Sequence, residues 1–133
     1  MTIFVLDTNV ISDIVNPKAN LNVLANLAAN RQQVICLCEA VDYEIRRGYM
    51  RKAATTRLDA YEKLIKPQFE WTPLEYNDWV QASHYWADAV NRGKQLSDID
   101  LLIAALATRL DAVIVSADTD FDVLPIKRED WRR

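Results

Sequence analysis

The chain has 133 residues, half of them hydrophobic, and a formal net charge of −3 at pH 7. This length suits one domain with a full hydrophobic core, and two glycines and four prolines are too few for a disordered or low-complexity chain. The apolar runs are much shorter than the about 20 residues that a membrane-spanning helix needs, and the first residues lack the basic segment of a signal peptide. We therefore expect a single domain over residues 1–133 that lies in the cytoplasm and not in a membrane.

Strands and helices are predicted to alternate along the chain. Short apolar runs predict buried strands at residues 3–6, 34–38 and 112–116, and weaker signals indicate strands near 69–72 and 123–126. Apolar residues at helical spacing predict helices at residues 9–15, 21–30, 53–66, 75–92 and 98–109, and one more that carries Glu44 and ends at or beyond Gly48. Asn16-Pro17, Pro67 and Gly93 are the expected stops of three helices. In the helix at 75–92 we expect a core-facing stripe of Trp79, Ser83, Trp86 and Val90.

Continuously apolar strands that alternate with helices are typical of a parallel sheet with helices on both faces. The sequence therefore predicts an α/β fold. In open sheets of this kind, functional sites lie at the carboxyl ends of the strands. The chemistry is accordingly expected just after Leu6, Cys38 and Val115.

Acidic residues recur at these strand ends. Asp7 directly follows the first strand, Asp118 and Asp120 follow the third, Glu44 lies on the helix that leaves the second, and Asp98 and Asp100 open the helix before the third. One Asp after a strand is ordinary turn chemistry, but several carboxylates converging on one crevice repel one another. Because Mg²⁺ and Mn²⁺ take oxygen ligands, such a cluster predicts a site for a hard cation.

Other catalytic chemistries fit the sequence poorly. His84 is the only histidine and is expected on a helix away from the strand ends, and Cys36 and Cys38 are expected as small core residues. The sequence also contains no glycine-rich phosphate loop. Without a histidine to act as a base, a metal that lowers the pKa of water is the remaining way to activate water for hydrolysis.

The segment from residue 46 to residue 66 carries seven basic and two acidic side chains, although the whole chain is acidic. A solvated helix face explains such a segment, and so does a surface that neutralises the phosphates of a nucleic acid. The residue types leave both interpretations open. The second predicts RNA-binding contacts at Arg46, Arg47, Arg51, Lys52 and Arg57.

Four segments resemble motifs of one known family, in the family's order and spacing. They are VLDTNVIS at residues 5–12, DYEIRRG at 42–48, LSDIDLLIAA at 96–105 and SADTDF at 116–121, and the tail at 129–131 is also similar. The family is that of the PIN-domain ribonucleases, in particular the VapC-type toxins of VapBC toxin–antitoxin systems. The resemblance extends from about Ile3 to Trp131, with Ser116 where the family usually has Thr.

The resemblance implies a three-layer α/β/α sandwich with a central parallel sheet, and an acidic pocket for Mg²⁺ or Mn²⁺. It implies a metal-dependent endoribonuclease that is the toxin of a type II toxin–antitoxin system. Such an enzyme hydrolyses RNA phosphodiester bonds, in tRNA or rRNA loops, by metal-activated water, leaving a 5′-phosphate and a 3′-hydroxyl. The resemblance also implies a cognate antitoxin, a small DNA-binding protein of the VapB type, and a homodimer.

The motifs place three catalytic acids at Asp7, Glu44 and Asp100, and the fourth at Asp118 or Asp120, of which we favour Asp118. We expect Asp7 and Asp100 to be direct metal ligands. Asp118 is expected to join them directly or through water, and Glu44 to hold a second metal or the attacking water.

The neighbouring polar residues receive secondary roles. Asp98 and Asp120 are weaker metal candidates, and Asp98 in particular lies two residues from Asp100, a spacing that does not share a helix face. Thr8, Asn9 and Ser116 are expected to orient the ligands. Asn9 equally suits a helix cap.

Several other functions compete with the nuclease. A haloacid-dehalogenase-type phosphatase needs a second Asp where this chain has Asn9, and a response-regulator receiver needs a lysine where the third strand is followed by Ser116, Ala117 and Asp118. Two alternatives remain, a housekeeping PIN nuclease in RNA maturation and a non-catalytic RNA-binding or interaction module. The short chain favours the toxin over the first, and the complete set of acids favours catalysis over the second.

Overall fold

The computed structural model describes every residue of the chain except 17 and 19. Its strands are β1 (Ile3–Leu6), β2 (Val34–Leu37), β3 (Glu70–Trp71), β4 (Val113–Val115) and β5 (Lys127–Glu129). Its α-helices are α1 (Thr8–Val15), α2 (Leu21–Ala29), α3 (Glu39–Arg51), α4 (Thr55–Ala60), α5 (Tyr76–Asn91) and α6 (Asp98–Leu110). Asn16 caps the carboxyl end of α1, whereas Pro17, the other half of the predicted stop, lies outside the described residues.

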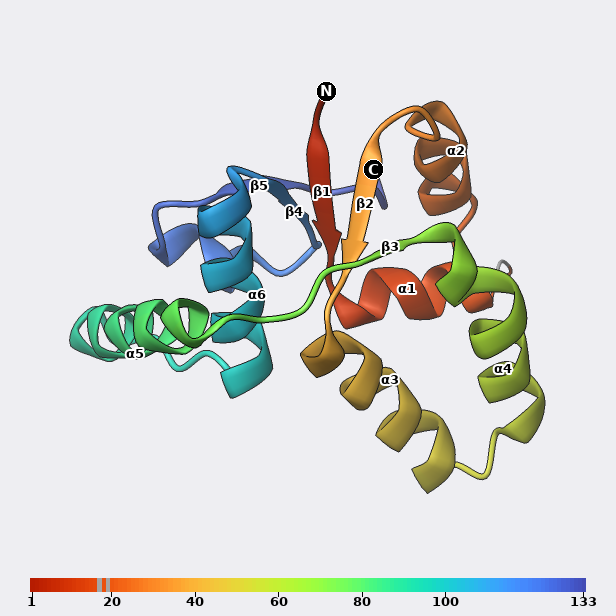
Figure 1. The fold of residues 1–133 in the computed structure, drawn as a ribbon, viewed down its shortest axis with the longest axis horizontal. Coiled ribbons are helices and arrows are strands. Elements are labelled where there is room, and N and C mark those ends of the chain that lie inside the picture. The colour runs from red at the N-terminus through yellow and green to blue at the C-terminus, as the bar shows by residue number, and fades with distance from the viewer. Residues whose placement is uncertain (17, 19) are drawn as a thin grey trace.

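The strands form one sheet in the order β3-β2-β1-β4-β5, and every neighbouring pair is parallel. The predicted α/β fold with a central parallel sheet is therefore confirmed. In the view of Figure 1, α5 and α6 lie to the left of β1 and β2, and α2 and α4 lie to the right. The arrows of β1 and β2 point the same way, toward the ends of α1 and α3 that follow them.

The core is built around β1, β4 and α6. The side chains of β1 and β4 are buried except for the partly exposed Ile3 and Val113. Residues 101–107 of α6 are all buried, which explains why this segment is apolar on every face. Near the carboxyl terminus Trp131 packs edge-on against Phe4 with the ring centroids 5.2 Å apart. Among the described helices, none combines the length and the apolar character needed to cross a membrane.

The predicted inner stripe of α5 is wrong. Trp79 and Trp86 are 56% and 51% exposed, whereas the buried face consists of Asp78, Ala82, Tyr85 and Ala89. Polar side chains anchor this face to α6, because Arg109 pairs with Asp78 and Tyr85 hydrogen-bonds to Thr108 at 2.6 Å. A hydrophobicity pattern assigns Asp and Tyr to the solvent-exposed face of a helix. It therefore predicted that the face with the two tryptophans is buried.

The predicted basic helix at 53–66 is also interrupted. It is α-helical only in α4, and it continues as a π-helix over Tyr61–Ile65 and a 3₁₀ turn over Lys66–Gln68 that contains Pro67. The extra residue of the π-helix accompanies the complete burial of Tyr61, whose hydroxyl donates to Asp42 at 2.6 Å. The π-helix ends at Ile65, close to the predicted stop, and Pro67 lies in the first positions of the 3₁₀ turn, where the main-chain N–H is not needed.

The carboxyl-terminal strand lies later than predicted. Residues 119–123 form a 3₁₀ turn, and the strand β5 occupies Lys127–Glu129 in place of 123–126. Its side chains are polar because it lies at the edge of the sheet, so its pairing with β4 rests on main-chain hydrogen bonds. An apolar pattern gives no signal for such a strand.

The ion pair between Asp78 and Arg109 is expected to be a main anchor of α5. The Asp78 side chain is 2% exposed, and Arg109 reaches it from 2.9 Å. Replacing Arg109 with Met leaves a buried carboxylate without its partner and should lower the free energy of unfolding by about 3 kcal/mol. Urea denaturation measures this. The matched control is Lys127→Gln, which removes an exposed pair with Asp111 and should cost less than about 1 kcal/mol. Equal losses in the two variants would contradict the assignment.

Candidate active site

A cavity of about 410 Å³ lies at the carboxyl ends of the strands. Four acidic side chains from separate segments line it: Asp7 at the end of β1, Glu44 on α3, Asp100 on α6, and Asp118 after β4. The remaining lining residues are Thr8, Asn9, Ser12, Ile45, Arg47, Gly48, Tyr49, Lys52 and Ser97. The fold therefore gathers acids that lie up to 111 residues apart in the sequence, from Asp7 to Asp118, around one space.

Asp7 is held in place by both of its carboxylate oxygens. It is the N-cap of α1, so the Thr8 main-chain N–H donates to Oδ1 at 2.7 Å, and the Ser116 hydroxyl donates to Oδ2 at 2.8 Å. The residue is 6% exposed. Burial raises the pKa of Asp7, the two hydrogen bonds oppose this rise, and the nearby charges of Glu44 and Asp118 add to it.

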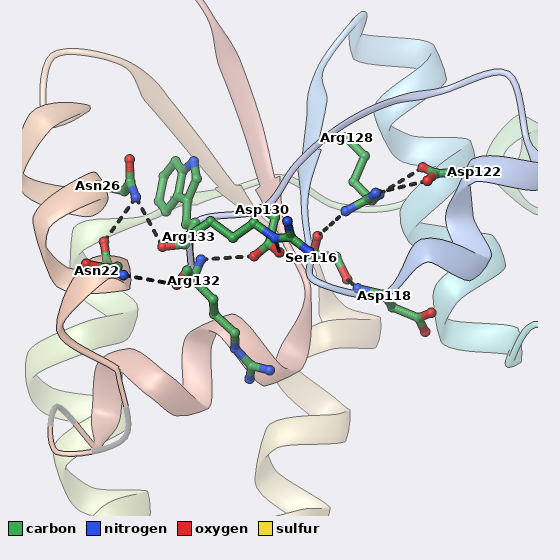
Figure 2. Close-up of polar contacts among 10 residues, drawn as sticks. Asn22, Asn26, Ser116, Asp118, Asp122, Arg128, Asp130, Arg132 and Arg133 are labelled. Atoms are coloured by element: carbon green, nitrogen blue, oxygen red, sulfur yellow. Dashed lines mark hydrogen bonds and ion pairs between the residues drawn. The ribbon is translucent and has the colours of Figure 1, made fainter.

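Ser116 connects Asp7 with Asp118. It is 1% exposed, and its oxygen donates to Asp7 while accepting the main-chain N–H of Asp118 at 3.0 Å. Figure 2 shows the link between Ser116 and Asp118. The Asp118 carboxylate itself accepts the main-chain N–H of Asp120 at 2.9 Å, which fixes the turn after β4. One hydroxyl thus sets the relative position of two of the four acids.

Asp100 lies in the first turn of α6. The Ser97 side chain caps this helix by accepting the main-chain N–H of Asp100 at 3.1 Å. Burial raises the pKa of Asp100 to about 6, and the charges of Asp7, Glu44 and Asp118 contribute while a hydrogen bond with Ser97 opposes the rise. These charges act on Asp100 because all four acids line the same cavity.

Glu44 comes from the middle of α3 and faces the same cavity. Arg47, one turn later, lies 3.5 Å from it and also stacks over the ring of Tyr43. Both partners of this contact are partly exposed, so the ion pair is weak and Glu44 stays available to another cation.

The two weaker acidic candidates lie outside the cavity lining. Asp120 pairs with Lys94 at 3.2 Å, and Asp98 is exposed on the other side of the first turn of α6, beside Trp79. Of the predicted orienting residues, Thr8 and Asn9 line the cavity and Ser116 contacts Asp7. The Thr8 hydroxyl is buried and has no hydrogen-bond partner among the described residues.

The predicted RNA-binding residues divide into three groups. Arg47 and Lys52 line the cavity, and Arg51 and Arg57 are exposed beyond it. Arg46, in contrast, is occupied within the protein, because it donates to Asp42 at 2.9 Å and to Glu62.

The Asp42 carboxylate joins α3 to the π-helix. Although burial works in the opposite direction, hydrogen bonds from Tyr61 and Arg46 and the charges of Arg46 and Lys66 lower the pKa of Asp42. The network keeps Asp42 charged and holds Arg46 against the protein. Arg46 therefore stabilises the position of α3, the helix that carries Glu44.

A model of the PIN domain matches residues 4–127. The chain belongs to the PIN domain family. No curated protein sequence matches it.

Several solved structures share its fold. VapBC from Salmonella typhimurium bound to DNA is 22% identical with a TM-score of 0.84, over 98% of this chain and 99% of that chain. VapBC2 from Rickettsia felis bound to a promoter DNA fragment is 20% identical with a TM-score of 0.80, over 96% and 98% of the two chains. FitAcB from Neisseria gonorrhoeae is 23% identical with a TM-score of 0.80, over 96% and 97%. These similarities show that the PIN fold extends over nearly the whole chain.

The donor set of this PIN domain suits a hard cation, although it does not form a closed cage. Among the described residues, no group of three or more His, Cys, Asp or Glu side chains is arranged to hold one metal ion. Mg²⁺ does not require such a group, because it usually keeps several waters and binds through one or two carboxylates. Asp7 and Asp100 repel each other and can supply the two carboxylates, and the cavity that they line has room for the waters.

Several lining residues were not singled out in the sequence. Gly48 follows Glu44 by four residues and Ser12 follows Thr8 by four residues, so helical spacing could have found both. A side chain at Gly48 would meet no atom within 4 Å of its Cβ, so this glycine leaves the cavity wall open. No signal in the sequence pointed to Tyr49.

The acid cluster is expected to make the metal-free protein less stable as the pH rises. Because the folded-state pKa of Asp100 is raised from 3.8 to about 6, its protonated form favours folding, and that contribution is lost as the pH rises from about 4 through about 6. Asp100→Asn removes the ionisation. Thermal melting in EDTA is measured from pH 4 to pH 8. The melting temperature of the variant should rise relative to that of the wild type between about pH 4 and pH 6 and stay higher above pH 6. Parallel curves would contradict the raised pKa.

Proposed function

We propose that this PIN domain, spanning residues 1–133, is an endoribonuclease that depends on Mg²⁺ or Mn²⁺ and hydrolyses phosphodiester bonds in tRNA or rRNA loops. The observation that carries the proposal is the convergence of Asp7, Glu44, Asp100 and Asp118 on one cavity, with Arg47 and Lys52 in the same wall. Phosphodiester hydrolysis needs carboxylates that can bind a metal ion and positively charged side chains that can bind the phosphates, and this cavity has both.

The roles follow from how each acid is held. Asp7 and Asp100, the two acids with raised pKa values, would bind the metal directly, and Asp118 would join them directly or through water. Glu44 would hold a second metal or orient the attacking water. When bound, the metal supplies a lower pKa for water and stabilisation of negative charge on the phosphate.

The other residues of the site orient the ligands and the RNA. Ser116 keeps Asp7 in one orientation, and Thr8 would do so through its main-chain N–H. Asn9 lines the cavity and would hydrogen-bond to ligand waters. Arg47 and Lys52 would bind phosphates next to the scissile bond. The water oxygen forms the new bond to phosphorus and the 3′ oxygen leaves with a proton, which yields a 5′-phosphate and a 3′-hydroxyl.

The nuclease is tested by incubating purified protein with total RNA and sequencing the new 5′ ends. We expect discrete cuts with Mg²⁺ or Mn²⁺ that disappear with EDTA. Asp7→Asn and Asp100→Asn should each slow cleavage by about a hundredfold or more, the scale of losing a positioned catalytic group. The matched control is Asp111→Asn, which removes an exposed acid far from the cavity. Equal cleavage by all four proteins would mean that the activity does not belong to this site.

The same assay distinguishes the two acids after β4. Asp118 lines the cavity, whereas Asp120 pairs with Lys94, so Asp118→Asn should lose far more activity than Asp120→Asn. The reverse order would assign the fourth acid to Asp120.

The RNA surface is expected to extend from the cavity along the end of α3. Replacing Arg51 and Lys52 together with Gln should weaken RNA binding and reduce the slope of log K against log salt by about 0.7 for each lost phosphate contact. Fluorescence anisotropy with a catalytically inactive Asp100→Asn background measures this. Arg31→Gln, an exposed cation next to the start of β2, is the control. An unchanged slope in the double variant would remove both residues from the interface.

We further propose that the nuclease is a VapC-type toxin held by a cognate antitoxin, a small DNA-binding protein of the VapB type, in the cytoplasm. Support comes from the PIN fold shared with VapBC of Salmonella typhimurium over nearly both whole chains. Expression in a host should arrest growth, and Asp100→Asn or co-expression of a small DNA-binding protein encoded next to the gene should relieve the arrest. Growth that is unaffected by an active nuclease would favour the housekeeping alternative.

We also propose a homodimer. The exposed Trp79 and Trp86 on α5 supply apolar surface for contact with a second copy. Light scattering should give twice the chain mass for the wild type and a smaller mass for a Trp79→Ser, Trp86→Ser variant. A monomeric wild type would remove the dimer from the proposal.

A further inference from the structure

The carboxyl-terminal strand β5 lies beside β4, the strand that Ser116 and Asp118 follow. It pairs in parallel with β4, and the ladder continues past the strand because the Ser116 main-chain N–H donates to the Glu129 carbonyl at 2.9 Å. Ser116 is therefore held by β5 on its amide side. The residue before Glu129 is Arg128, the middle residue of the strand.

Arg128 holds the other side of the same residue. Its Nη1 donates to the Ser116 carbonyl at 3.0 Å, while Nε and Nη2 donate to the two carboxylate oxygens of Asp122 at 2.8 and 2.9 Å (Figure 2). The Arg128 side chain is 17% exposed. A planar guanidinium that meets a carboxylate with two parallel hydrogen bonds has little freedom to rotate. Asp122 thus fixes the direction in which Arg128 meets Ser116.

The importance of this contact comes from what Ser116 does. Its hydroxyl donates to Asp7 and accepts from the Asp118 main chain, so a rotation of its backbone would move two acids of the cavity relative to each other. Asp122 lies in the 3₁₀ turn that begins directly after Asp118. Arg128 therefore contacts both ends of the segment 116–122, which contains Asp118, at Ser116 and at Asp122.

We propose that Arg128, anchored by Asp122, is a positioning residue that holds Ser116 and through it sets the geometry of Asp7 and Asp118 for metal binding. This inference rests on the proposed metal-dependent function of the cavity. Arg128 itself touches neither the cavity lining acids nor the substrate position, so it acts only through Ser116.

The charges of the pair support this role. The pKa of Asp122 is lowered by its hydrogen bond with Arg128, so the clamp stays charged near neutral pH. The pKa of Arg128 is raised first by Asp122, and also by the charges of Asp130 and Asp118. Of the four cavity acids, Asp118 is the one whose negative charge acts on Arg128.

A purely structural role has to be distinguished from positioning. Other contacts hold the tail that follows β5, because Asn22 and Asn26 donate to the carbonyls of Arg132 and Trp131 at 3.1 Å (Figure 2), and Arg132 pairs with Asp13 at 2.6 Å. These contacts remain when Arg128 is replaced. Lys127→Gln is the matched control, since it changes the neighbouring residue of the same strand and only breaks an exposed pair with Asp111.

The test is a Mg²⁺ titration followed by NMR at the main-chain amides of Thr8 and Asp118 in wild-type protein, Arg128→Gln, Asp122→Asn and Lys127→Gln. We expect Arg128→Gln to move both amide resonances before metal is added and to weaken Mg²⁺ binding about 10- to 100-fold, the usual cost of losing an outer partner of a metal ligand. Asp122→Asn, which keeps the arginine but removes its anchor, should shift the same amides and weaken binding less. Lys127→Gln should match the wild type.

The outcomes separate this inference from the function on which it rests. Mg²⁺ affinities of Arg128→Gln and Asp122→Asn within twofold of the Lys127→Gln control would overturn the positioning role while leaving the metal site intact. Should Arg128→Gln fail to fold, Asp122→Asn decides alone by the same criterion. A wild-type protein whose Thr8 and Asp118 amides do not respond to Mg²⁺ would overturn the proposed function, and this inference with it.

Discussion

Carboxylates gathered at the carboxyl edge of the sheet repel one another, and the fold holds them together against that repulsion. Asp7 is fixed by a helix cap and by Ser116, and Asp100 by the capped first turn of α6. Each acid is thus attached to a rigid element whose position is set by the core and not by the site. Burial, and after it the negative charges of the other acids, raises the pKa of Asp100 to about 6.

This arrangement exchanges stability for binding. A site that holds ionised acids close together destabilises the empty protein at neutral pH, and a bound cation offsets the repulsion and stabilises the folded state by mass action. The buried elements around the site offset this loss of stability. Residues 101–107 of α6 are fully enclosed, and β1, which ends in Asp7, is paired on both sides by β2 and β4. The proposed cation site is therefore attached to deeply buried elements of the molecule.

Much of this fold could be predicted from the sequence, because its central elements carry strong local signals. The runs 3–6, 34–37 and 113–115 are apolar on both faces, as buried parallel strands must be. The rule that sites follow such strands also predicts the gathering of Asp7, Glu44, Asp100 and Asp118 at one edge of the sheet, and the family motifs contain the same four acids. These residues share one cavity because the carboxyl ends of parallel strands meet at one edge of the sheet. The alternation of strands and helices in the sequence is enough to predict this topology.

The remaining features depend on contacts between distant residues that no local pattern contains. The tryptophans of α5 lie outside because Asp78 finds Arg109 31 positions away, and Arg46 is withdrawn from the surface because Asp42 and Glu62 accept its hydrogen bonds. In the sequence Arg128 is one of several charged residues in a polar tail, and only the structure shows its hydrogen bond to Ser116. Hydrophobic periodicity assigns a polar side chain to solvent, and it fails wherever a buried partner satisfies that side chain.

The most direct test of the central claim is a crystal structure of the wild-type protein grown with Mn²⁺, with anomalous diffraction recorded at the manganese edge. The acid cluster predicts an anomalous peak inside the cavity, bonded to Asp7 and Asp100 with water in its remaining positions, and loss of that peak in Asp100→Asn. A well-ordered cavity without manganese at saturating Mn²⁺, or manganese bound elsewhere on the protein alone, would contradict it.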